Sequence, residues 1–320
     1  MIVRNGLDQV EPLLAELEIE RPLLIASERW SDLELPHEGR WSEVPTDRIA
    51  EAAEAAAGCD GVLAVGGGSA IDLAKAVSAE AGLPLVSVPT TYSGAEWTDY
   101  YGIRDPRRRM KGGGGGAHLA GIVYEPKLTL GLPRAESGGT AMNALAHCAE
   151  ALYVKGRSPQ ADTQALEGAH LIGTALPAVL ADPDDPGPRT TLLLGARHAG
   201  EALALAGLGL GHAMAQAVGG RYGIAHGAAN ALCLAPALRF NQEVAAKEIE
   251  RFGKGIATDD PIRRTEDLAR LAGFERLRDL GVPEDELDEV AEAASVRNGA
   301  KNNPRPASPA DIAELLRSVW

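Results

Sequence analysis

The sequence predicts an α/β protein in which a domain with a doubly wound parallel sheet precedes an all-helical domain. From residue 1 to about 135, short apolar runs alternate with helical segments, an order typical of a parallel sheet covered on both faces. After about residue 136, strand signals fade and long helices rich in alanine and leucine follow. The 320 residues suffice for two domains of ordinary size, which we place at 1–135 and 136–320.

The elements of the first domain follow from short sequence patterns. The segment Asp47–Ala57 is rich in alanine and glutamate and is predicted to be a helix. Ligands of doubly wound sheets bind at the carboxyl ends of the strands, so the residues just after each strand are the candidates for a site. The predicted buried strands are Leu23–Ser27, Gly61–Val65, Leu85–Val88 and Gly121–Tyr124.

Three glycines follow the second predicted strand, in GVLAVGGGSAIDLAKAVS. Gly66, Gly67 and Gly68 lead into a helix expected to open at Ser69, and Ser69 and Asp72 have the spacing of a capping box. Glycines allow backbone amides to approach an anion closely, and a helix N-terminus favours negative charge. A pyrophosphate is the natural occupant, although the motif is neither GxGxxG nor a Walker A loop. The alternative is a tight turn that binds nothing.

Small hydroxyl side chains follow the third predicted strand. Thr90, Thr91 and Ser93 lie in VPTTYSGAEWTDYYGI. Hydroxyl groups at the end of a strand can bond to the ribose or amide of a nucleotide. Equally, they can serve as hydrogen-bonded turn residues.

A dense cluster of basic residues stands out in a chain of formal charge −14. It includes Arg104 and Lys111, and the five glycines Gly112–Gly116 follow it directly. The glycine run favours a mobile loop. The cluster is a candidate contact for an anionic substrate or cofactor, and a solvated surface loop is the alternative interpretation.

Composition narrows the remaining classes of function. The acidic balance argues against a nucleic-acid partner, since such domains usually carry a basic face. Three cysteines form no disulfide framework, which favours a reducing compartment. No apolar stretch of about 20 residues predicts a membrane span, and the N-terminus lacks the pattern of a signal peptide. We therefore expect a soluble cytoplasmic protein.

The helical half contains three histidines in notable contexts. Asn143 and His147 are four residues apart, which places them on one helical face. His212 is expected near the start of a second helix, and His226 follows in YGIAHGAANALCLAP. Three neutral imidazoles converging from separate helices can bind a divalent metal. The alternative for each is a buried, hydrogen-bonded histidine.

Five ordered motifs resemble the iron-containing alcohol dehydrogenase superfamily, which has a dehydroquinate synthase-like fold. They are GGGSAID, VPTTYSGAEWT, NALAHCAEALY, GHAMAQAVGGRYGIAHGAANALCLAP and the terminal NNPRPASPADIAELLRSVW. Within the superfamily the chain looks most like the maleylacetate reductases. The threonine loop reads PTTYSGAE rather than PTTAGTGSE. Asn143 stands where the metal-dependent enzymes have an aspartate ligand, and Ser27 stands where an aspartate is common.

The resemblance implies a nucleotide-binding first domain, a helical second domain and NAD(H) or NADP(H) as cofactor. It implies that His147, His212 and His226 match the histidines of the metal site. Because Asn143 supplies no charge, we expect little or no tightly bound iron or zinc, and His212 or His226 then polarises the substrate oxygen. The residues matched to the cofactor site are Gly66, Gly67, Gly68, Ser69, Asp72, Thr90, Thr91, Ser93 and, with the early strand, Ser27.

The leading hypothesis from the resemblance is NAD(P)H-dependent reduction of maleylacetate to 3-oxoadipate, or of a similar oxo acid, as in the degradation of aromatic compounds. Arg104 or Lys111 would then pair with substrate carboxylates. The alternatives are an iron- or zinc-dependent alcohol dehydrogenase and a non-catalytic nucleotide-binding protein. Two departures concern the substrate: maleylacetate reductases usually have histidines where this chain has Gln216 and Asn230. A homodimer is expected.

Overall fold

The structure, a computed structural model, describes residues 1–105 and 107–320. It does not describe the side chain of Lys111. By contacts these residues divide into two compact units. Unit 1 comprises Met1–Thr91, Ala95–Asp105 and Gly112–Thr129, and unit 2 comprises Tyr92–Gly94, 107–111 and Leu130–Trp320. Two short pieces of the first half thus pack with the helices of the second. The boundary at residue 135, and the ligand roles assigned to the two domains, stay predictions.

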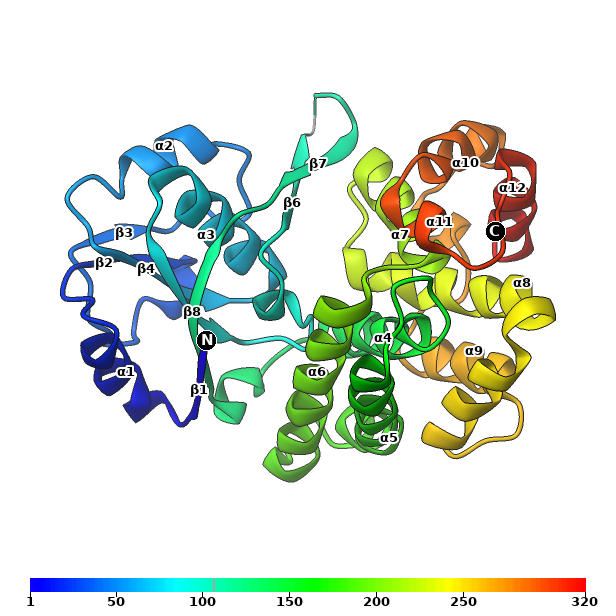
Figure 1. Cartoon of the computed structure of the whole chain (residues 1–320), viewed down its shortest axis with the longest axis horizontal. Coiled ribbons are helices and arrows are strands. Elements are labelled where there is room, and N and C mark those ends of the chain that lie inside the picture. The colour runs from blue at the N-terminus through cyan, green and yellow to red at the C-terminus, as the bar shows by residue number, and fades with distance from the viewer. Residues whose placement is uncertain (106) are drawn as a thin grey trace. The chain divides into compact units, whose positions relative to one another are not determined.

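Unit 1 is built on a parallel sheet, which confirms the predicted fold class (Figure 1). Among the described residues its strands run in the order β1-β8-β5-β4-β2-β3, and every neighbouring pair is parallel. Two short edge strands were absent from the sequence prediction, since β1 and β3 are half-buried and carry no continuous apolar run. The bounds are β1 Ile2–Asn5, β2 Pro22–Ala26, β3 Gly39–Trp41, β4 Gly61–Gly66, β5 Pro84–Pro89 and β8 His118–Tyr124.

Helices cover both faces of this sheet. The side chains of a strand point alternately to opposite faces, and the core divides accordingly. Leu63 and Val65 of β4 pack in the cluster that contains α1 (Val10–Glu16). Val62 and Ala64 of the same strand pack in the cluster that contains α2 (Ile49–Glu54) and α3 (Gly68–Ala81). Because both faces of these strands are buried, their sequences are continuous hydrophobic runs.

The capping box expected at the start of α3 is wrong. Gly67 is the N-cap, and no side chain caps the helix. The Asp72 carboxylate instead forms an ion pair with the Nζ of Lys75 at 2.8 Å and accepts a hydrogen bond from the amide of Gly102 at 3.1 Å. The buried Lys75 also donates to the carbonyl oxygen of Tyr100 at 2.7 Å. These bonds hold the start of β6 (Tyr101–Asp105) against α3.

Three of the five glycines, Gly112–Gly114, belong to a strand rather than to the mobile loop expected from composition. The strands β6 (Tyr101–Asp105) and β7 (Met110–Gly114) form a separate two-stranded sheet, visible as the extended hairpin of Figure 1. A Cβ added at Gly113 would overlap the carbonyl oxygen of Tyr101. Close approach of the two backbones, more than conformational freedom, therefore requires glycine at this position.

Unit 2 is a bundle of helices around α4 (Arg134–Ala151), which is buried along most of its length. Helices α5, α6 and α8 pack directly against it. The turn between α5 and α6 is shorter than the predicted loop Asp182–Arg189, because Asp185 caps α6 and Pro186 begins it. The other bounds are α5 Pro159–Ala181, α6 Pro186–Ala206, α7 Leu210–Tyr222, α8 His226–Gly255, α9 Pro261–Leu271, α10 Leu287–Ser295, α11 Asn298–Asn302 and α12 Pro309–Ser318.

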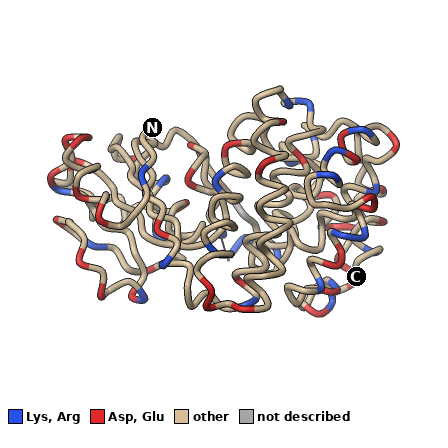
Figure 2. Tube along the Cα trace, turned by 90° about the horizontal axis from the view of Figure 1, so that it is seen from below, with Lys and Arg blue, Asp and Glu red and all other residues tan. Residues whose placement is uncertain are grey.

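The charges, the cysteines and the lengths of the apolar helices can be compared with the expectations from composition. Basic and acidic residues are interspersed in both units (Figure 2). Cys59, Cys148 and Cys233 are free thiols. In the described part of the chain no single helix is long and apolar enough to cross a membrane. Helices α6 and α7 meet that length and composition test only when taken together, as a pair bent by 102°.

The hairpin gives a first prediction. Replacing Gly113 with alanine should separate β6 from β7, because the added methyl group meets the Tyr101 carbonyl. Amide hydrogen exchange should become at least about tenfold faster in the hairpin, with the main sheet unchanged. Gly115→Ala is the matched control, since its Cβ would lie 3.8 Å from the nearest atom, in Tyr100. Equal protection in the two variants would contradict this account.

Candidate active site

Unit 1 places the glycine and threonine motifs side by side. Strands β4 and β5 are neighbours with Gly66 opposite Pro89, and the amide of Thr90 donates to the carbonyl oxygen of Gly66 at 3.0 Å. A Cβ at Gly67 would lie 2.8 Å from the Cγ2 of Thr91. The Thr91 hydroxyl oxygen is buried and has no hydrogen-bond partner. An unsatisfied hydroxyl beside a glycine turn at the N-terminus of α3 fits the phosphate or ribose of a nucleotide.

The other residues predicted for this site have different surroundings. Ser69 is exposed in the first turn of α3, and Ser27 follows β2 at the same edge of the sheet, half-buried. Asp72 is engaged with Lys75 and Gly102, so it supports the loop rather than offering a vacant carboxylate. Ser93 belongs to unit 2, where its carbonyl oxygen accepts a hydrogen bond from Asn143.

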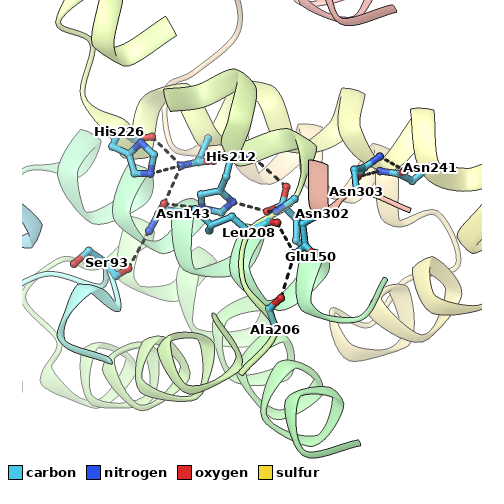
Figure 3. A network of polar contacts seen from close by, with 12 residues as sticks. Ser93, Asn143, Glu150, Ala206, Leu208, His212, His226, Asn241, Asn302 and Asn303 are labelled. Atoms are coloured by element: carbon cyan, nitrogen blue, oxygen red, sulfur yellow. Dashed lines mark hydrogen bonds and ion pairs between the residues drawn. The ribbon is translucent and has the colours of Figure 1, made fainter. Parts of the chain in front are cut away.

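Unit 2 brings together the three histidines predicted from sequence, and Figure 3 shows two of them, His212 and His226, beside Asn143. His147 lies on α4, His212 in the first turn of α7, and His226 at the start of α8. The rings of His147 and His212 stack with centroids 4.6 Å apart, and those of His212 and His226 are 5.7 Å apart. Small residues on these helices permit such close packing. The predicted convergence of separate helices is therefore present in the fold.

Asn143 stands at the centre of a hydrogen-bond network. Its Oδ1 accepts from the amide of Asn230 at 2.8 Å and lies 3.3 Å from the Nε2 of His212. Its Nδ2 donates to the carbonyl oxygen of Ser93 at 3.0 Å. The Asn230 amide also donates to the carbonyl oxygen of His226, which sets its orientation. The orientation of the Asn143 amide follows, with its oxygen facing His212.

Glu150 is a site residue that the sequence interpretation missed. Its carboxylate is fully buried, and Oε2 lies 2.7 Å from both the Nδ1 of His212 and the amide of Gly209. Oε1 accepts from the amide of His212 at 3.2 Å. A signal was available in the sequence, since Glu150 follows His147 by three residues and Asn143 by seven, on the same helical face.

The two ring nitrogens of His212 both face oxygen atoms. Nδ1 faces the Glu150 carboxylate and Nε2 faces the amide oxygen of Asn143. Burial and the neighbouring His212 lower the pKa of His147 well below its ordinary value, and His147 Nδ1 has no hydrogen-bond partner. Burial therefore favours the neutral form of the His147 imidazole.

These residues do not fit a tightly bound metal ion. Across the described residues, no group of three histidine, cysteine, aspartate or glutamate side chains is arranged to hold one. The Nε2 of His226 lies 3.1 Å from the Asn230 amide, and the oxygen nearest to His212 Nε2 is a neutral amide. Neutral imidazole nitrogens can bind a divalent ion, but Asn143 adds no negative charge to hold it tightly. No chemical step is therefore assigned to a metal.

The predicted substrate contacts lie on the β6–β7 hairpin. Arg104 is half-buried in β6 of unit 1. The side chain of Lys111 lies outside the described residues. Arg109, at the hairpin tip, stacks on the ring of Tyr222 and donates to the carbonyl oxygen of Arg221 at 3.2 Å.

Comparisons with known proteins agree with the two-part architecture. The family described as iron-containing alcohol dehydrogenase matches residues 2–120, and the C-terminal family of Fe-containing alcohol dehydrogenases matches 138–320. A maleylacetate reductase of Burkholderia cepacia is 35% identical over 82% of this chain and 74% of its own length. Maleylacetate reductase 1 of Cupriavidus pinatubonensis is 31% identical over 96% and 90%.

Solved structures give the same result. The maleylacetate reductase from Rhizobium sp. strain MTP-10005 superimposes with a TM-score of 0.89 at 28% identity, covering 100% of this chain and 95% of the other. A putative alcohol dehydrogenase from Ralstonia eutropha JMP134 reaches 0.91 at 30% identity, with coverages of 100% and 95%. A 1,3-propanediol oxidoreductase shares the fold, with a TM-score of 0.93, 24% identity and coverages of 100% and 98%.

The buried His147 predicts a pH dependence of stability. The pKa of His147 in the folded protein lies well below the ordinary 6.5. Between these two pKa values, the imidazole is protonated in the unfolded chain and neutral in the folded protein. Stability is therefore lost as the pH falls below about 6.5, by up to about 1.4 kcal/mol per pH unit. His147→Asn should remove this loss, measured as the free energy of urea unfolding between pH 7.5 and 5. The exposed His37, changed to Asn, is the control. A parallel decline in wild type and His147→Asn would refute the assignment.

Proposed function

Because the chain belongs to the iron-containing alcohol dehydrogenase family, we propose that this oxidoreductase uses NAD(P)H to reduce maleylacetate to 3-oxoadipate, or a similar oxo acid. One observation carries the choice within the family. Asn143 bonds to Asn230, Ser93 and His212, where a metal-dependent enzyme needs a carboxylate ligand. Similarity to several maleylacetate reductases supports the same substrate.

Unit 1 supplies the cofactor site in this proposal. The turn Gly66–Gly68 and the first turn of α3 bind the pyrophosphate through backbone amides. The Thr91 hydroxyl, which has no partner within the protein, donates a hydrogen bond to the phosphate or ribose of the cofactor. Thr90 holds the two loops together through Gly66. When bound, the reduced nicotinamide supplies the hydride. NADH and NADPH are not distinguished by Ser27 and Glu28, one neutral and one acidic, after β2.

Unit 2 supplies the acid. Hydride addition to the carbon–carbon double bond conjugated with a ketone places negative charge on the ketone oxygen. A buried, preorganised donor stabilises that charge far better than water does. His212 is such a donor, since Glu150 fixes its Nδ1, and the substrate oxygen would take the place of the Asn143 amide oxygen that faces Nε2 at 3.3 Å. His226 and His147, both adjacent to that ring, complete the polar wall of the site.

The test is an assay of NADH and NADPH oxidation with freshly generated maleylacetate. Turnover with either cofactor, unaffected by a chelator, is expected. Turnover with simple aldehydes that is lost on chelation would favour the metal-dependent alcohol dehydrogenase instead. Cofactor binding without turnover on oxo acids or aldehydes would favour the non-catalytic protein. The cytoplasmic location and the homodimer expected from sequence stay predictions.

The glycine turn gives a prediction about the cofactor. A methyl group at residue 67 would meet Thr91 at 2.8 Å and displace the loop that faces the phosphates. Gly67→Ala should weaken NADH binding about tenfold or more, measured by calorimetry. Gly39→Ala in the same sheet is the control, since its Cβ would make an ordinary 3.4 Å contact with Leu23. Unchanged affinity in Gly67→Ala would move the cofactor site elsewhere.

Asn143 gives a prediction about metals. In Asn143→Asp a carboxylate replaces an amide beside two histidines, which should raise Zn²⁺ affinity about tenfold or more. Without metal the variant should be less stable, since a carboxylate would face the carbonyl oxygen of Ser93. Calorimetry and thermal unfolding with and without Zn²⁺ measure both effects. Asn241→Asp, in a separate buried amide pair with Asn303, should gain no affinity. An equal gain in both variants would contradict the placement of the site.

A further inference from the structure

Arg297 is a partly buried cation with no acidic partner. None of the ion pairs among the described residues includes it. Its Nε is inaccessible to solvent and makes no hydrogen bond, and Nη1 donates to the Oε1 of Gln216 at 3.3 Å. Burial lowers the pKa of its guanidinium, and no neighbouring carboxylate acts in the opposite direction. A partly buried charge without an acidic partner loses part of its hydration without compensation, and such groups often belong to functional sites.

The backbone that carries Arg297 is firmly held against α7. Arg297 is the N-cap residue of α11, and a Cβ at Gly299 of that helix would overlap the carbonyl oxygen of Gly209. The Asn302 amide donates to the carbonyl oxygens of Ala206, the last residue of α6, and of Leu208, in the connection to α7 (Figure 3). The backbone that carries Arg297 is therefore anchored next to α7.

The position of Gln216 connects Arg297 to the histidine cluster. Gln216 follows His212 by four residues on α7, so the two side chains share one helical face, one turn apart. The Gln216 amide accepts only from Nη1, and the buried Nε cannot be reached by a ligand, so the free edge of the guanidinium is its Nη side. The two Nη groups of a planar guanidinium match a carboxylate, which accepts two parallel hydrogen bonds from them.

We propose that Arg297, oriented by Gln216, binds a carboxylate of the substrate one helical turn from His212. This inference rests on the proposed function, because it names the group by which that site recognises an oxo acid. It assigns the carboxylate contact to the helical unit instead of to Arg104 or Lys111 on the hairpin. The unpaired cation is thus explained as a site whose acidic partner is the substrate itself.

The experiment measures ligand binding without turnover, in the full-length chain with NADH present. The probes are adipate, a six-carbon dicarboxylate, and adipamide, its neutral counterpart. Calorimetry should show that wild type prefers adipate, and that Arg297→Met binds adipate about tenfold or more weakly while adipamide is unchanged. Arg297→Lys should recover part of the loss, since it keeps the charge but not the fork. With maleylacetate, Arg297→Met should raise KM much more than it lowers kcat.

The Tm of the Arg297 variants distinguishes a role in substrate binding from a role in stabilising the fold. Removing a partly buried charge that has no acidic partner should leave the Tm of Arg297→Met equal to or above that of wild type, whereas a structural arginine would lower it. Arg317→Met, which breaks an exposed pair with Asp288, is the matched control and should leave adipate binding unchanged. A lowered Tm with unchanged adipate affinity overturns the inference, as does an equal loss in Arg317→Met or the absence of adipate binding in wild type. Because binding is measured directly, a failed maleylacetate assay counts against the proposed function alone.

Discussion

The Glu150 carboxylate is the group on which the arrangement of the histidine cluster depends. It is fully buried and accepts hydrogen bonds from two backbone amides as well as from the His212 ring. A buried carboxylate is tolerated only when its oxygens are satisfied in this way. By satisfying it, the first turn of α7 is positioned against α4, and the ring of His212 is oriented in the same step. The contact that holds α7 against α4 thus also orients the imidazole that we propose as the acid.

In the proposed function, the same network lets an imidazole do the work of a metal ion. The oxygen of the Asn143 amide accepts from Asn230 and faces His212, and its nitrogen is bonded to the Ser93 carbonyl. A carboxylate at this position would repel the carbonyl and attract a cation. We therefore propose that the amide at residue 143 leaves His212 to stabilise charge on the substrate.

Much of the fold was predictable because its signals are local. Buried parallel strands need continuous apolar runs, and such runs at Gly61–Val65 and Leu85–Val88 agree with β4 and β5 within one residue. Composition alone predicts a mobile loop for the glycine run, because it carries no information about the strand that pairs with Gly112–Gly114. Its pairing partner, Tyr101 in β6, requires glycine through contact with the backbone.

The sequence by itself determined the fold class, the glycine and threonine loops, and the identity of the three histidines with Asn143, because apolar periodicity and residue spacing act within a few residues. Only the tertiary structure decided what those groups meet. Asp72 pairs with Lys75, His212 pairs with Glu150, and Arg297 is left beside Gln216 without a carboxylate. These pairings depend on helices that are distant in sequence, and on burial, which turns a weak surface contact into a strong constraint on charge.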